Sequence, residues 1–165
     1  MMNTDRKTEV YALFETLGIP YRVAEHPPMF SQADSEKHRV SIDAVIFKNL
    51  FLRNADKSHY YLLSLPLTKR ADLVKVREIL GESRLSFGDE DALLEKLNIS
   101  PGSVSFLNII GKPGTDVTFL IDKEICAGER FGVHPNDNTA TIIFSPRDIP
   151  KIFDHFGAKY RFAEV

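Results

Sequence analysis

The sequence contains no tryptophan and a single cysteine, Cys126, among its 165 residues. One cysteine cannot form an internal disulfide framework, and without Cys or His clusters at ligand spacing no structural metal site is expected. No apolar run approaches the ~20 residues of a membrane-spanning helix, and the polar start MMNTDRKTEV does not have the pattern of a signal peptide. We therefore expect a soluble, cytoplasmic protein in a reducing compartment.

A strong net charge is also missing, because the sequence has 21 basic and 23 acidic residues and a formal charge of −2. Such a balance creates no global field for nucleic acid, so any RNA contact must be a local basic patch. The sequence has no internal repeat, no P-loop and no dinucleotide fingerprint, so neither ATP nor NAD is expected and no cofactor is predicted. The length predicts one domain, residues 1–165, with a single core.

Residues 130–144, RFGVHPNDNTATIIF, predict two strands joined by a polar turn. Alternation before the turn and β-branched or aromatic residues after it suit a pleated sheet, and Pro-Asn-Asp-Asn at 135–138 is typical of a turn. A histidine at the junction of strand and turn lies at the rim of the sheet, where pockets open. His134 is therefore either a functional residue or a structural hydrogen-bonding group.

Residues 43–65 carry the strongest strand signal. Two mostly apolar arms flank a polar turn at 54–58, which predicts a hairpin at the centre of a sheet with both faces covered. Lys48 interrupts the first arm, and a buried ammonium is costly unless it reaches an anion or water. Lys48 either serves the site or extends to the surface at a bulge, and its neighbour Asn49 either joins it or merely serves that bulge.

Periodicity and capping signals predict the remaining elements. Leu93, Leu94 and Leu97 are expected to face inward, and the basic face of Lys69, Arg70, Lys75 and Arg77 is either solvated or a phosphate patch. The expected helices are 4–17, 31–38, 68–80, 89–97 and 145–156, and the further strands are 21–25, 104–110, 117–121 and 160–165.

The loop Asn98–Ser103 precedes one of these strands and contains Pro101-Gly102. Glycine at position 102 lets the backbone approach a ligand closely, and consecutive amides at such a turn can stabilise a developing oxyanion. An ordinary Pro-Gly turn is the alternative interpretation.

Three segments, Ile46–Leu52, Pro101–Ser105 and FGVHPNDNTATI at 131–142, together resemble the prolyl-tRNA synthetase editing-domain family, also called YbaK-like. More narrowly they resemble its free-standing branch, which hydrolyses alanine from mischarged tRNA(Pro). The resemblance covers nearly the whole chain and implies an α+β fold with a curved, mixed, largely antiparallel and partly barrel-like sheet flanked by helices. It implies that Lys48 binds the terminal phosphate or adenosine, that the Gly102 loop holds the carbonyl, and that His134 orients the substrate or water.

The resemblance also implies a set of substrate-binding residues around these three. They are Phe47, Asn49, Ser103, Val104, Ser105, Phe106, Pro135, Asn138 and Thr139. Phe47, Phe106 and Ile110 are expected as apolar walls of a pocket for a small amino acid. The family's loop has the pattern Gly-x-x-x-Pro, and here Phe106 replaces the proline, which affects the expected rigidity and selectivity of the loop.

The implied partner is the acceptor end of tRNA(Pro), with no membrane and no DNA. A transient contact with prolyl-tRNA synthetase or the elongation machinery is left open. Two alternatives remain: a deacylase that removes cysteine or another small residue from tRNA(Pro), and a tRNA-binding or regulatory module without chemistry.

Overall fold

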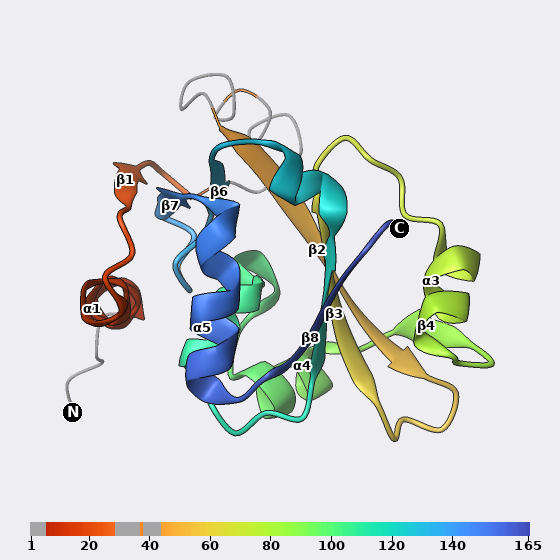
Figure 1. Cartoon of the computed structure of the whole chain (residues 1–165). Coiled ribbons are helices and arrows are strands. Elements are labelled where there is room, and N and C mark those ends of the chain that lie inside the picture. The colour runs from red at the N-terminus through yellow and green to blue at the C-terminus, as the bar shows by residue number, and fades with distance from the viewer. Residues whose placement is uncertain (1–5, 29–36, 38–43) are drawn as a thin grey trace.

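A long hairpin occupies the middle of the sheet in the computed structural model, which describes residues 6–28, 37 and 44–165 (Figure 1). Its strands, β2 (Val45–Asn54) and β3 (Tyr60–Pro66), pair in antiparallel register from Phe47↔Pro66 to Arg53↔Tyr60. Leu62, Leu63 and Leu65 of β3 have no exposed surface. The predicted central hairpin with covered faces is therefore confirmed.

In the part of the chain that the structure describes, the sheet has eight strands in the order β1-β7-β6-β2-β3-β5-β8, and β4 pairs with β2 off this path. The other strands are β1 (Arg22–Glu25), β4 (Leu85–Phe87), β5 (Thr118–Asp122), β6 (Phe131–Val133), β7 (Ala140–Phe144) and β8 (Lys159–Ala163). Among the described pairs β2–β6, β3–β5 and β5–β8 are parallel, and the others are antiparallel. The predicted mixed α+β fold is confirmed, with a sheet that stays open rather than closing into a barrel.

Helices cover both faces of the hairpin (Figure 1). The described α-helices are α1 (Arg6–Leu17), α3 (Leu73–Leu80), α4 (Glu90–Leu97) and α5 (Ile149–Phe156). On one face Leu52 and Leu63 cluster with Val76 of α3. On the other, Phe51 and Leu62 belong to a larger core that includes residues of α1, α4 and α5. Successive residues of β2 therefore contact different layers, as the alternation of a strand requires.

Short 3-10 turns replace the strand expected at 104–110. They are η1 (Pro101–Ser103) and η2 (Phe106–Ile110), with η3 (Lys123–Ala127) and η4 (Pro146–Asp148) elsewhere. Ser105 and Asn108 form a reciprocal capping box, in which each side chain accepts from the other end of the turn. These local hydrogen bonds satisfy backbone groups that a strand would have paired, so the strand prediction is wrong.

The helix predicted at 68–80 begins only at Leu73, because the Asp72 side chain caps it by accepting from Lys75 N. Lys69 thus lies outside the helix and pairs with the buried Asp122 (2.8 Å) and with Glu124 (3.3 Å). Of the two alternatives for this basic face, the ion pairs of Lys69 weaken the phosphate patch, because one of its four cations is already neutralised.

The helix α4 buries two of its three expected leucines. Leu93 and Leu97 of α4 are buried as predicted, but Leu94 is 59% exposed, so its inward placement is wrong. The helix predicted at 31–38 lies outside the described residues except for Lys37.

The strand predictions at 21–25, 117–121 and 160–165 are confirmed by β1, β5 and the edge strand β8.

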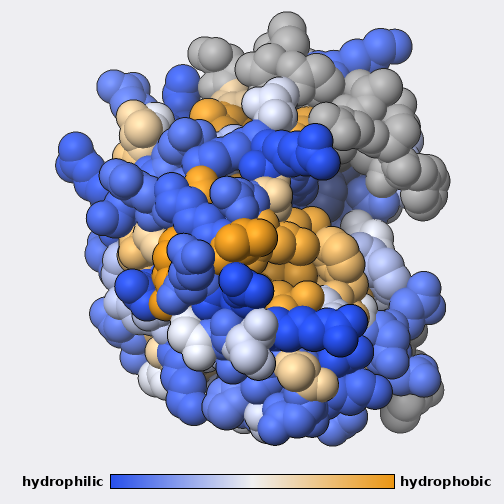
Figure 2. All heavy atoms as spheres, turned by 90° about the vertical axis from the view of Figure 1, so that its right-hand side faces the viewer, coloured by the Kyte–Doolittle hydropathy of each residue, from blue (hydrophilic) through white to orange (hydrophobic). Residues whose placement is uncertain are grey.

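The side of the molecule that carries α3 and β4 shows a patch of apolar side chains within a hollow that is bordered by hydrophilic ones (Figure 2). Val74 of α3 and Phe87 of β4 are exposed large apolar residues. Leu50 of β2 and Leu73 of α3 are partly buried and pack against the cluster that contains Leu52 and Val76.

Candidate active site

The three segments singled out in the sequence meet through side-chain to backbone hydrogen bonds. From β2, Asn49 Nδ2 donates to Val104 O (2.9 Å), while Ser64 Oγ of β3 donates to Asn49 Oδ1 (2.6 Å). From the loop, Ser105 Oγ donates to His134 O (3.4 Å). Asn49 therefore ties the central hairpin to the Gly102 loop, and Ser105 ties that loop to the turn after β6.

The sheet pairing is regular through Phe47↔Pro66, Lys48↔Leu65 and Asn49↔Ser64. Neither Lys48 nor Asn49 thus lies at a bulge, and the alternative that they serve one is wrong.

A buried pair of asparagines, Asn108 and Asn136, fixes the loop against the turn. Asn108 Nδ2 donates to Asn136 Oδ1 (2.7 Å) and to Ser103 O (3.2 Å), and Asn108 Oδ1 accepts from Ser105 N (2.9 Å). Asn136 Nδ2 in turn donates to Leu107 O (3.2 Å). Asn136 has a φ of 60°, a left-handed conformation that asparagine tolerates better than most residues. Since both side chains are almost fully buried, this network holds two separate chain segments in one geometry.

Lys48 and His134 lie on the same face of the sheet. Phe47 stacks on Phe106 and Asn49 reaches Val104, so the intervening Lys48 projects from the opposite face of β2. The parallel pairing Ile46↔Gly132 places Ile46 and Gly132 on one face, and Lys48 and His134 each follow two residues later. Lys48 is half-buried, and within the described part of the chain no carboxylate pairs with it. This face thus carries both an ammonium that no described carboxylate neutralises and an imidazole.

The electrostatics of His134 favour a neutral ring. Burial lowers the pKa of His134, a hydrogen bond to the Ala140 carbonyl opposes this shift, and the neighbouring His26 adds to it. His134 Nδ1 lies 3.0 Å from Ala140 O, and because a carbonyl only accepts, Nδ1 carries the proton. His134 therefore offers an unprotonated Nε2 as a hydrogen-bond acceptor near neutral pH.

The turn residues and the Gly102 loop line a cavity of about 440 Å³. Ser103, Asn138 and Thr139 contribute to its wall together with Arg6. A Cβ at Gly102 would lie 3.7 Å from Asn138 Nδ2, so loop and turn are in near contact there. Lys7 Nζ donates to Thr139 Oγ1 (3.1 Å), which in turn donates to Asp137 and lowers the pKa of that carboxyl group.

Phe47 and Phe106, predicted as pocket walls, belong to the core instead. Phe106 has no exposed surface and contacts the rings of Phe47, Phe131 and Phe153 at centroid distances of 5.6 to 5.9 Å. The expectation that Phe106 lines a substrate pocket is therefore not met. Its ring instead packs the start of η2 into the aromatic core. Ile110 is partly buried, and Pro135 is buried at the start of the turn.

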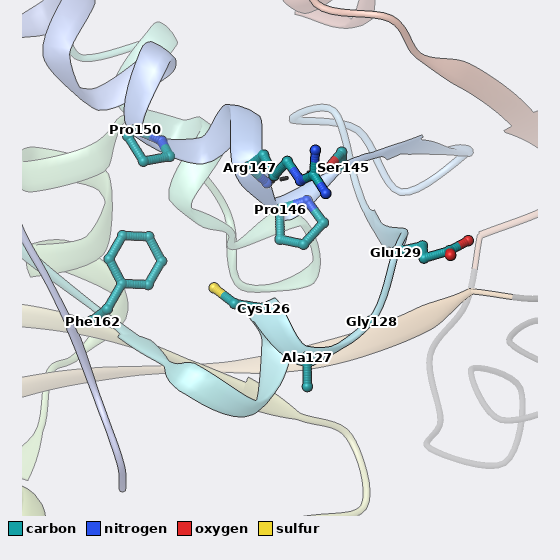
Figure 3. A pocket seen from close by; sticks show the side chains of 9 residues that line it. All are labelled: Cys126, Ala127, Gly128, Glu129, Ser145, Pro146, Arg147, Pro150 and Phe162. Carbon is teal, nitrogen blue, oxygen red and sulfur yellow. Dashed lines mark hydrogen bonds between the residues drawn. The ribbon is translucent and has the colours of Figure 1, made fainter.

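A second cavity, of about 620 Å³, lies away from these residues between η3, η4 and β8 (Figure 3). Cys126, Pro146 and Phe162 line it together with Arg147. Burial raises the pKa of the Cys126 thiol, and Asp122 adds to this, so the thiol is not an activated nucleophile.

Among the described residues there is neither a metal site nor a membrane-spanning helix. No group of three or more His, Cys, Asp or Glu could hold a metal ion, and no helix is long and apolar enough to cross a membrane.

The sequence interpretation missed Ser64, Asn108 and Asn136. Ser105-x-x-Asn108 has the spacing of a capping box, which could have located Asn108. Asn136 stands in a turn where a left-handed residue is expected, which could have drawn attention to it. Ser64 has no local signal, because its role depends on pairing with Asn49 across the hairpin.

The α+β fold and the three joined segments are those expected of an editing domain, and comparison with known proteins shows the family. The pattern of the aminoacyl-tRNA editing domain family matches residues 26–152. The chain belongs to this family, and the predicted membership of the YbaK-like group is confirmed.

Among individual relatives, the chain is similar to the prolyl-tRNA editing protein ProX of Acetoanaerobium sticklandii, with 32% identity over 99% of this chain and 100% of that protein. It is also similar to prolyl-tRNA synthetase associated domain-containing protein 1 of Mus musculus, with 31% identity over 90% of this chain and 89% of the relative. A crystal structure described as a candidate trans-editing enzyme for prolyl tRNA synthetase has the same fold, with a TM-score of 0.69 at 18% identity over 99% of both chains.

Proposed function

We propose that this protein is a trans-acting deacylase that hydrolyses the ester between alanine and tRNA(Pro). The observation that carries the proposal is that hydrogen bonds of Asn49, Ser105 and Asn108 tie the strand that carries Lys48 to the Gly102 loop, and that loop to the turn that begins at His134. The name of one relative, a prolyl-tRNA editing protein, supports the same class of substrate. Editing of this kind acts on a mischarged tRNA, so the proposed partners are tRNA(Pro) and, transiently, prolyl-tRNA synthetase.

The ester of an aminoacyl-tRNA is already activated, so the protein must mainly position it and stabilise the tetrahedral oxyanion. In our proposal Lys48 binds the terminal phosphate or adenosine, because it is a cation without a carboxylate partner among the described residues. Amides of the Gly102 loop meet the carbonyl oxygen, and Ser103 N and Ser105 N are not among them because they already donate within the loop. His134 Nε2 orients the attacking water, and the ribose 2′-hydroxyl assists.

Selectivity for alanine follows from size. A synthetase pocket built for proline cannot strongly reject the smaller alanine, because missing methylenes cost only about 1 to 3 kcal/mol. A second, smaller pocket can admit alanine and exclude proline by steric clash. Phe106 would set the size of this pocket indirectly, by holding residues 102–105 against the aromatic core.

The decisive comparison is amino-acid release from Ala-tRNA(Pro), Cys-tRNA(Pro) and Pro-tRNA(Pro) under identical conditions. We expect release from the alanyl ester to exceed release from the prolyl ester by at least about a hundredfold. Preferential release of cysteine would instead support a cysteinyl deacylase. Salt-dependent tRNA binding without release from any ester would support a non-catalytic binding module.

The state of His134 predicts the dependence of activity on pH. Because its pKa is lowered from the ordinary value of about 6.5, the ring stays neutral at pH 7 and Nε2 is lost as an acceptor only when pH falls through the lowered pKa. The value of kcat/KM should therefore be level near neutrality and decline only below about pH 6.5.

A matched variant tests this assignment. His134→Asn retains a donor, Nδ2, close to the position of the histidine Nδ1 and can keep the bond to Ala140 O while it removes Nε2. We expect a folded protein with lower kcat/KM whose decline at acid pH has disappeared. If kcat/KM of this variant still declined at acid pH as in the wild type, His134 would be ruled out as the origin of the decline.

A further inference from the structure

A second imidazole, that of His26, lies against the ring of His134. The two ring centroids are 5.7 Å apart and the ring planes are inclined by 55°. His26 follows directly after β1, and its backbone N–H donates to Thr139 O (3.0 Å), so the chain is still held beside the start of β7 at this point. A residue distant in sequence thus contributes a ring to the candidate site.

The strand register places both rings on one face of the sheet, where β1, β7 and β6 lie side by side (Figure 1). Across β1–β7, Ala24 lies opposite Thr141, and opposed residues share a face. His26 follows Ala24 by two residues and therefore lies on the face of Thr141. Continued by one pair, the β6–β7 register places His134 opposite Thr141 as well. The two histidines thus share the face that carries Lys48.

Two hydrogen bonds fix the ring of His26 and its tautomer. Its Nδ1 lies 2.8 Å from Pro27 O, and because a carbonyl only accepts, Nδ1 carries the proton. Thr141 Oγ1, which is 2.9 Å from Nε2, therefore donates to that nitrogen, and Thr141 itself is buried. Since both ring nitrogens of His26 bind protein groups, the ring acts on the site through its contact with His134.

The ring of His134 is held less firmly by its own hydrogen bonds. Within the described part of the chain the ring makes one such bond, which Nδ1 donates to Ala140 O (3.0 Å). A single hydrogen bond leaves the ring free to turn about it, whereas packing against a second, fixed ring selects a preferred inclination. The contact with His26 therefore determines the direction in which His134 Nε2 points.

The groups around the pair act on the charge of His134 in opposite directions. Burial lowers the pKa of His134, the imidazole of His26 lowers it further, and the Ala140 carbonyl and Asp137 raise it. Charge repulsion between two adjacent imidazolium rings is the reason for the effect of His26. Four cations lie on the neighbouring described elements: Lys48 on the same face of β2, Lys7 of α1 at Thr139, and Arg22 and Arg130, each four residues before the histidine in its own segment.

We propose that His26 is a positioning residue, whose fixed ring orients the ring of His134 so that Nε2 is directed toward the substrate. The inference rests on the proposed function, because it takes His134 as the group that orients the attacking water. His26 then acts on the chemical step and not on affinity. Its removal should lower kcat about 10- to 100-fold with little change in KM, because a displacement of about 1 Å in a reacting geometry costs a rate factor of up to about a hundred.

The test uses the full chain with the double substitution His26→Leu and Thr141→Val. This variant removes both partners of one hydrogen bond, so no buried hydroxyl is left without its acceptor. The control is His155→Gln, which removes an exposed imidazole near the end of α5, where the ring contacts Phe156.

Three readouts are compared. The first is kcat and KM for Ala-tRNA(Pro) as a function of pH. The second is the titration of the His134 ring, followed by nuclear magnetic resonance with isotope-labelled histidine and assigned by the signal that His134→Asn lacks. The third is the midpoint of thermal unfolding, which reports any general loss of structure.

The inference predicts a lower kcat in the double variant and a titration of His134 that moves to higher pH. Without His26 no second imidazole opposes the charge of His134, so the imidazolium forms at higher pH and the acid decline of kcat/KM moves in the same direction. The control should match the wild type in both readouts.

Wild-type kcat in the double variant, with or without a shifted titration, would overturn the positioning role and leave the proposed function intact. A lower kcat with an unchanged titration and a lower unfolding midpoint would assign the loss to general structure and also overturn it. If the wild type released no amino acid, the proposed function would fail. The titration alone would then decide, because an unchanged His134 signal would show that His26 does not control this ring.

Discussion

Lys48→Ala should lower kcat/KM for Ala-tRNA(Pro) by about 100- to 1000-fold, the range seen when a preorganised charged or hydrogen-bonding group is removed from a partly dry site. The ammonium is half-buried on a sheet face and has no carboxylate partner in the described residues, so its charge is available to the substrate. Stability should not fall, because truncation removes a desolvated charge and breaks no described ion pair.

Two variants make the result specific. Lys57→Gly removes the same charge from an exposed turn residue whose φ of 60° suits glycine, and it should retain full activity. Lys48→Arg keeps the charge but changes its shape, and it should recover only part of the activity. Equal losses in Lys48→Ala and Lys57→Gly would show that net charge, and not the position of Lys48, controls the rate.

Asn108→Leu should destabilise the protein by about 3 kcal/mol, because it leaves Ser105 N–H, Ser103 O and Asn136 Oδ1 buried without their partner. For a domain of this size the midpoint of thermal unfolding should fall by about 10 °C. Circular dichroism measured during heating gives this midpoint, and Thr68→Val, which removes an exposed polar group, is the control.

The same substitution should also lower kcat/KM well below the unfolding temperature. Asn108 joins the Gly102 loop to the turn that carries His134, so its loss lets two parts of the site move independently. A variant with an unchanged melting midpoint and unchanged kcat/KM would show that this network neither stabilises the fold nor holds the site.

Local patterns were sufficient for the elements whose signal lies within a few residues. The apolar arms around the turn at 54–58 predicted β2 and β3, and the turn after His134 predicted β6 and β7. The prediction of a strand at 104–110 was wrong, although the β-branched and aromatic residues of this segment favour one. In the fold the bonds between Ser105 and Asn108 outweigh that propensity.

Long-range pairing could not be derived from local patterns. The parallel register of β2 with β6 puts Lys48 and His134 on one face, although 86 residues separate them in sequence. The burial of Phe106 likewise depends on rings from β2, β6 and α5.

The most direct test of the account is the rate of alanine release from Ala-tRNA(Pro) with the protein at catalytic concentration and Lys48→Ala measured in parallel. The account predicts many turnovers by the wild type, slow release from Pro-tRNA(Pro), and a rate close to spontaneous hydrolysis for the variant. Release by the wild type at no more than the spontaneous rate would contradict it, as would equal release by the wild type and Lys48→Ala.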